Sequence, residues 1–124
     1  MKTELTIEQS AKLIELGVDR KLASIKEFVP IHPEVLKGNA EYAKPWGWFP
    51  KFTLTDILSI LPKEVIYNRV SENLTIFIDN NKSTATYPFY NSNDADFESP
   101  ELIDSLYQLL IWTITNGYLN QKKK

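Results

Sequence analysis

The sequence predicts an α+β fold in which a small antiparallel sheet packs against three helices. Three segments, 7–16, 54–61 and 100–116, have apolar residues at helical spacing and capping residues at their ends. Two segments between the second and third helices, 74–79 and 84–90, have strand patterns on either side of a turn. These patterns favour a meander of about three or more strands with the helices on one face.

Length and composition predict a single globular domain. The chain has 124 residues, of which 43% are hydrophobic, and a chain of this length buries about 65% of the surface that it exposes when unfolded. One core is therefore sufficient to hold the fold together. We expect a single domain over 1–121, followed by a basic tail at 122–124.

The residue counts argue against most familiar catalytic and metal-binding arrangements. There is no cysteine and one histidine, His32, which removes thiol nucleophiles, cysteine-ligated metals and multi-histidine sites. No G-x-S-x-G motif is present for that histidine to serve as a base. We therefore expect no catalytic residue of a known motif, no metal and no cofactor.

The distribution of charged and apolar residues bears on compartment and partners. Glutamates follow Lys2 where a signal peptide needs an apolar stretch, which predicts a cytoplasmic protein. The longest apolar run, 109–112, is too short to cross a membrane, so we expect no membrane insertion. Residues 83–121 carry five acidic and no basic side chains, so we expect no nucleic-acid partner.

The first helix has clear end signals. Thr6 and Gln9 have the spacing of a capping box, and Gly17 supplies a left-handed residue that ends the helix. Val18, just past that glycine, is expected to fold back onto the helix. The predicted buried face consists of Ile7, Ala11 and Ile14, flanked by Leu13 and Leu16.

The segment that follows has a weaker pattern. Residues 24–31 are rich in apolar and β-branched side chains, which predicts a strand that Pro30 places at an edge or an end. Residues 33–50 contain three prolines and two glycines, which predicts a long structured loop.

The second helix has the clearest pattern of the chain. Thr53 is its expected N-cap, Asp56 stands at the third helical position, and Pro62 ends it. Leu54, Ile57, Leu58 and Leu61 repeat at i, i+3, i+4 and i+7. We expect this whole stripe, including Leu58, to lie in the core.

The two hairpin strands are joined by Asn80 and Asn81, which readily adopt the left-handed conformations of a two-residue turn. With that turn, Ile76 lies opposite Ala85 and one face of the hairpin is apolar. A third strand at 65–70 would complete the meander.

The third helix is expected to begin after Ser99 as N-cap, with Pro100 in the first position, and to end at Gly117. Its few polar positions predict burial over most of its circumference. The acidic run 91–98 before it lacks the glycine and glutamate of a calcium loop, counted from Asp94. We therefore interpret that run as a polar loop.

The densest aromatic stretch, 41–52, contains the candidate binding residues. Trp46 and Trp48 are two residues apart, so they share one face if the chain is extended. With Lys44 and Lys51 they form a candidate surface for a ligand or partner, whereas the alternative is that the rings cover the core. We expect Trp48 to be buried and Trp46 to be partly exposed.

Several helix motifs together suggest a relationship. They are PKFTLTDILSILP at 50–62, LTIEQ at 5–9 with LGVD at 16–19, and LIDSLY at 102–107 with Trp112 and Asn116-Gly117. In these motifs the chain resembles a group of small, uncharacterised proteins of gut anaerobic bacteria and their prophages. The resemblance implies a common fold and a mobile-element setting, and it carries over no catalytic residue.

We predict a small non-enzymatic interaction or adaptor protein, phage-derived as the resemblance implies, that binds a protein partner or itself. The first alternative is a module that binds a carbohydrate or a peptide at the Trp46 and Trp48 surface. The second is a carboxylate-dependent hydrolase. An exposed aromatic groove would favour the binding module, whereas ordered carboxylates in a concave pocket would favour the enzyme.

Overall fold

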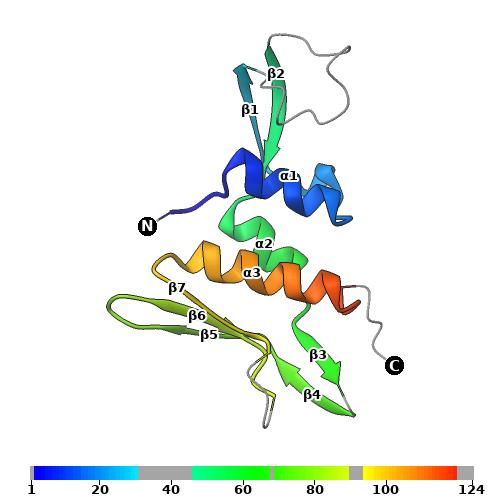
Figure 1. The fold of residues 1–124 in the computed structure, drawn as a ribbon, viewed down its shortest axis with the longest axis vertical. Coiled ribbons are helices and arrows are strands. Elements are labelled where there is room, and N and C mark those ends of the chain that lie inside the picture. Colours follow the sequence, from blue (N-terminus) through cyan, green and yellow to red (C-terminus); the bar gives the residue numbers. More distant parts are fainter. Residues whose placement is uncertain (1, 31–45, 68, 90–93, 120–124) are drawn as a thin grey trace.

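Three stacked helices lie between a two-stranded arm and a group of short strands (Figure 1). The structure is a computed structural model that describes residues 2–30, 46–67, 69–89 and 94–119. In chain order its elements are α1 (Ile7–Glu15), the 3-10 turn η1 (Arg20–Leu22), β1 (Ile25–Pro30), β2 (Trp46–Lys51), α2 (Leu54–Ile60), β3 (Glu64–Tyr67), β4 (Val70–Asn73), β5 (Thr75–Ile78), β6 (Ser83–Thr86), β7 (Asp96–Ser99) and α3 (Leu102–Thr115). Helices and small antiparallel sheets together confirm the α+β class.

The ends of α1 follow the prediction. The N–H of Gln9 donates to the Thr6 hydroxyl oxygen at 3.0 Å, and the Thr6 N–H donates back to the Gln9 side chain at 3.0 Å. Gly17 has a φ of +113°, and the N–H of Val18 beyond it donates to the carbonyl of Leu13 at 3.0 Å. The capping box and the glycine stop are thus both confirmed.

The predicted buried face of α1 is rotated from the observed one. Ser10 and Leu13 are the buried residues of this helix, whereas Ala11 is exposed. The reason is that the Ser10 hydroxyl accepts a hydrogen bond from the buried N–H of Phe52 at 3.1 Å, which brings a polar residue into the core. Ile7 and Ile14 are partly buried and border the arm, and Ile14 also packs against the core.

The arm is an antiparallel pair formed by β1 and β2 (Figure 1). β1 confirms the predicted strand in 24–31. The interpretation of 33–50 as a loop is wrong for Trp46–Pro50, because these residues pair with Lys26–Pro30 of β1. Residues 33–45 of the predicted loop and His32 lie outside the described part of the chain.

The capping box of α2 is also confirmed. The N–H of Asp56 donates to the Thr53 hydroxyl at 3.1 Å, and the Thr53 N–H donates to the Asp56 carboxylate at 2.9 Å. The prediction that Leu58 lies in the core is wrong, since 39% of this residue is exposed while Ile57 is fully buried. The stripe of α2 that meets the core consists of Leu54, Ile57 and Ile60, and Leu58 lies outside it.

This contrast gives a first testable prediction. Ile57→Ala should lower the free energy of unfolding by about 2 to 5 kcal/mol, because it removes a fully buried side chain. Leu58→Ala should lower it by about 1 kcal/mol or less, because that side chain already contacts water. Denaturant unfolding of the two variants would measure both values. Equal losses would show that the helix is rotated from the orientation described.

The main sheet is a meander in the order β5-β6-β7. Ile76 lies opposite Ala85, as the turn chemistry predicts, and Ala85 lies opposite Phe97 of β7. The prediction that 65–70 forms the third strand of this meander is wrong. That region instead contains β3 and the start of β4, which form a separate hairpin.

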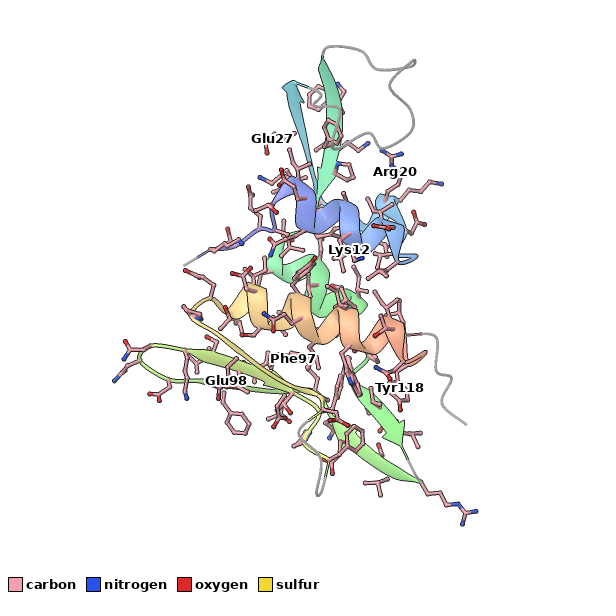
Figure 2. All side chains as sticks on the ribbon, in the orientation of Figure 1. Lys12, Arg20, Glu27, Phe97, Glu98 and Tyr118 are labelled. Carbon is pink, nitrogen blue, oxygen red and sulfur yellow. The ribbon has the colours of Figure 1, made fainter. Side chains whose placement is uncertain are left out.

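The third strand of the meander comes from the acidic run, so the interpretation of residues 96–98 as a loop is also wrong. Asp96 and Glu98 are exposed, whereas Ala95 is buried and Phe97 lies between β7 and α3 (Figure 2). The charged residues therefore occupy the solvent face of a half-buried strand. Residues 91–93 lie outside the described part of the chain.

α3 begins two residues later than predicted. Ser99 is the last residue of β7, and Glu101 stands at the N-cap without a side-chain capping bond. Gly117 follows the helix with a φ of +78°, which confirms the predicted end. In the described ranges no helix is both long and apolar enough to span a membrane.

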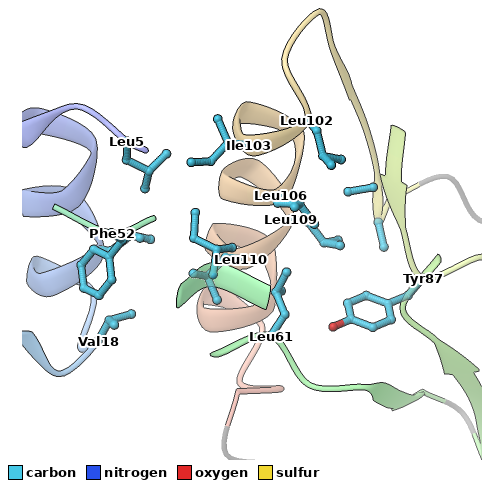
Figure 3. Packing of buried hydrophobic residues seen from close by; sticks show 14 of the residues in the cluster. Leu5, Val18, Phe52, Leu61, Tyr87, Leu102, Ile103, Leu106, Leu109 and Leu110 are labelled. Carbon is cyan, nitrogen blue, oxygen red and sulfur yellow. The ribbon is translucent and has the colours of Figure 1, made fainter. Parts of the chain in front are cut away.

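Core residues pack against α3 from two sides (Figure 3). Leu5 and Phe52 pack on the side of α1, whereas Tyr87 packs on the side of the sheet. The Tyr87 hydroxyl donates to the carbonyl of Pro62 at 2.5 Å, and burial raises the pKa of this phenol. Ser105 of α3 donates to the carbonyl of Ser83 at 2.7 Å, so polar bonds also join helix and sheet.

Candidate functional site

The arm has two different faces, because side chains alternate along a strand. On β2, positions 47, 49 and 51 share one face, and positions 46, 48 and 50 share the other. We call the first the inner arm face and the second the outer arm face.

Lys51 fixes the base of the arm through its inner face. Its ammonium group lies 2.6 Å from Glu4 and 2.9 Å from Glu27, and 13% of its side chain is exposed. Hydrogen bonds to Glu4 and then Glu27 raise the pKa of Lys51 despite its burial. The next residue, Phe52, is fully buried. The arm therefore starts from a fixed position on the core.

A small apolar groove lies where the arm meets α1. It has a volume of about 160 Å³ and is lined by Ile7, Ala11, Ile14, Arg20, Phe49 and Pro50. Arg20 and Glu27 lie on opposite sides of the base of the arm (Figure 2). The apolar residues of α1 that were expected in the core thus line this groove.

The outer arm face exposes Trp48. This residue is 63% exposed, so the prediction that it is buried is wrong. The strand register pairs Trp48 with Phe28, Trp46 with Pro30, and Pro50 with Lys26. Since directly opposite residues share a face, these six positions belong to the outer arm face. Lys26 is the charged residue among them.

The structure separates the predicted site residues. Trp46 and Trp48 both stand on β2 at positions of the outer arm face, although the side chain of Trp46 lies outside the described part of the structure. Lys51 is on the inner face and is engaged by two carboxylates. Lys44 lies outside the described residues. Trp48 and Lys51 therefore do not form one surface.

A second concave region lies beside α2 and was not predicted from the sequence. It is an open cavity of about 430 Å³. Its lining residues are Gly17, Val18, Asp19, Leu22, Asp56, Ser59, Ile60 and Leu119. Two carboxylates, those of Asp19 and Asp56, thus border one cavity.

Both carboxylates accept hydrogen bonds from nearby backbone N–H groups. Asp56 accepts hydrogen bonds from the N–H and hydroxyl of Ser24 and from the N–H of Thr53. Burial disfavours the charged form, but these hydrogen bonds outweigh it and hold the pKa of Asp56 below its ordinary value of 3.8. Asp19 accepts from the N–H of Lys21 at 2.9 Å as the cap of η1. Asp56 is therefore ionised at neutral pH and unsuited to donate a proton.

The other groups of polar side chains in the described ranges do not indicate a metal site or a catalytic site. No group of three or more acidic or histidine side chains there is placed to hold a metal ion. Asp96 accepts a hydrogen bond from the Thr86 hydroxyl across β6 and β7, so this carboxylate joins two strands. Trp48 on the arm is one of the most exposed large apolar residues of the described surface, together with Phe77 and Ile78.

Fold and site define this chain as a small α+β protein with an anchored aromatic arm. Comparison with protein-family models, with curated protein sequences and with solved structures finds no significant match.

Proposed function

We propose that this chain is a non-enzymatic interaction protein that binds a protein partner through the outer arm face. The observation that carries the proposal is the 63% exposure of Trp48 on a strand whose base is fixed by Lys51 and Phe52. Tryptophan is enriched among the residues that dominate interface energies. A surface that is already fixed also loses little conformational entropy on binding.

The composition of this face supports a protein partner over a charged ligand. Its positions are aromatic, proline or lysine, so they offer contact area and few directed hydrogen bonds. A partner with an apolar patch fits such a surface. The prophage setting and the cytoplasmic location are proposals that rest on the sequence.

The hydrolase alternative has less support. The cavity beside α2 contains two carboxylates, but Asp56 has a lowered pKa and both of its oxygens accept hydrogen bonds. A general acid needs a carboxyl that holds a proton near neutral pH. The geometry therefore favours the interaction protein.

The test compares Trp48→Ala with Val70→Ala. Val70 is the control because it is a 46% exposed apolar residue on β4, far from the arm in the fold (Figure 1). Both changes should alter the free energy of unfolding by less than about 1 kcal/mol, since both side chains contact water. In affinity capture from the native cell, Trp48→Ala should lose proteins that wild type and Val70→Ala retain. Retention of the same proteins by all three would contradict the proposal.

A further inference from the structure

The β5 strand forms an edge of the main sheet that differs from the opposite edge. In the order β5-β6-β7, the two outer strands are β5 and β7. β7 carries the exposed carboxylates of Asp96 and Glu98, which discourage pairing with another strand. β5 has the sequence TIFI without a charge or a proline, and it exposes 59% of Phe77 and 71% of Ile78.

The hydrogen-bonding groups along that edge can be assigned from the turn. The N–H of Asp79 donates to the carbonyl of Lys82 at 2.9 Å. Because bonded and non-bonded pairs alternate in an antiparallel ladder, Phe77 bonds toward β6, whereas the backbone groups of Ile76 and Ile78 point away from it. The Leu74 N–H agrees with this alternation, since it points outward and donates to Lys63 at 2.8 Å.

We propose that β5 pairs with β5 of a second copy of this chain, antiparallel and about a two-fold axis at Phe77. Residues that lie opposite each other in neighbouring strands point to the same face of the sheet. With Phe77 opposite Phe77, the helices of both copies therefore lie on the same face of one continuous sheet. Phe77 then faces Phe77 of the second copy as a close, non-bonded pair. Ile76 of each copy lies opposite Ile78 of the other, and each such pair exchanges both backbone hydrogen bonds.

The length of the open edge supports this occupant. The carbonyl of Lys63 accepts a hydrogen bond from the N–H of Leu74, so the edge is open from Thr75 onward and an incoming strand must end before Leu74. In the proposed register the last residue of the incoming strand, opposite Thr75, is Asp79 of the second copy, where β5 gives way to the turn. The open segment and the strand that fills it therefore have the same length, and the two-fold axis repeats this fit at the other end of the interface.

The strand is four residues long, so we expect a reversible dimer that forms with increasing concentration. Sedimentation velocity of the wild-type chain over a range of concentrations should show it. Phe77→Lys should weaken dimerisation about 10-fold, because it places like charges directly opposite each other at the two-fold axis, whereas Val70→Lys, at an exposed apolar position of β4, should leave it unchanged. A wild-type chain that stays monomeric at every concentration would overturn the proposal.

A cysteine cross-link tests the register itself, because the chain contains no other cysteine. In Phe77→Cys, the two thiols of the dimer would lie at a non-bonded pair, where the separation of Cα atoms is compatible with a disulfide. Mild oxidation should therefore produce a covalent dimer. Ile78→Cys is the matched control, since Ile78 is more exposed than Phe77 but would not lie opposite itself. Equal or faster cross-linking of Ile78→Cys, or none of Phe77→Cys, would contradict the register.

Discussion

Phe52→Ala is expected to lower the free energy of unfolding by about 3 to 5 kcal/mol, the range for large buried aromatic residues. Phe52 is fully buried between α1 and α3 (Figure 3). Its carbonyl accepts a hydrogen bond from the N–H of Leu5 at 2.9 Å, and its N–H donates to Ser10. These backbone hydrogen bonds fix the segments around the ring. The segments therefore cannot move together to fill the cavity that the alanine variant would leave.

Chemical denaturation followed by circular dichroism would measure this loss. Phe52→Leu is the control, because it keeps most of the apolar volume and should lose clearly less stability. If the alanine variant lost less than about 1 kcal/mol, the base of the arm would not be part of the core.

Asp56→Ala is expected to lower the free energy of unfolding by about 2 to 4 kcal/mol. The change removes the carboxylate that completes the α2 capping box and that accepts three hydrogen bonds from Ser24 and Thr53. Asp19→Ala is the matched control, because Asp19 is an exposed cap of the short turn η1. We expect a loss of about 1 kcal/mol or less there. Similar losses in both variants would show that Asp56 acts as a helix cap alone.

The same carboxylate gives a pH dependence of known sign. The pKa of Asp56 is lower in the folded chain than its ordinary value of 3.8, so the unfolded chain binds this proton at higher pH. The stabilisation is therefore complete above about pH 4 and is lost as the pH falls through the folded-state pKa. Asp56→Asn should flatten this part of the profile below about pH 4. An unchanged slope would assign the acid sensitivity to other carboxylates.

Local chemistry explains which elements were predictable from the sequence. The capping boxes at Thr6 and Thr53 and the Asn80-Asn81 turn are satisfied by bonds within a few residues, so neighbouring residues determine them. The register of Ile76 with Ala85 follows from that turn. These predictions required no knowledge of the rest of the chain.

The errors arise where distant segments decide the structure. β2 forms despite Pro50 and Gly47 because β1 supplies its hydrogen-bond partner and α1 packs beside its base. The exposure of Trp48 follows from the projection of the arm beyond α1, which the aromatic content of the segment did not indicate. The cavity beside α2 combines residues from both ends of the chain. The alternation of residues 95–98 was the one available indication of β7.

The bonds that hold the N-terminal segment have a consequence for synthesis on the ribosome. The N–H of Lys2 donates to Glu101 at 2.9 Å, and its ammonium group lies 2.9 Å from Asp104. Leu5 belongs to the same buried cluster as Ile103 of α3. Since α3 is translated after all the other described elements, the growing chain carries these apolar residues uncovered until α3 has been made. Folding of this part of the chain therefore waits for α3, and a chain that stops before α3 would be a substrate for chaperones and proteases.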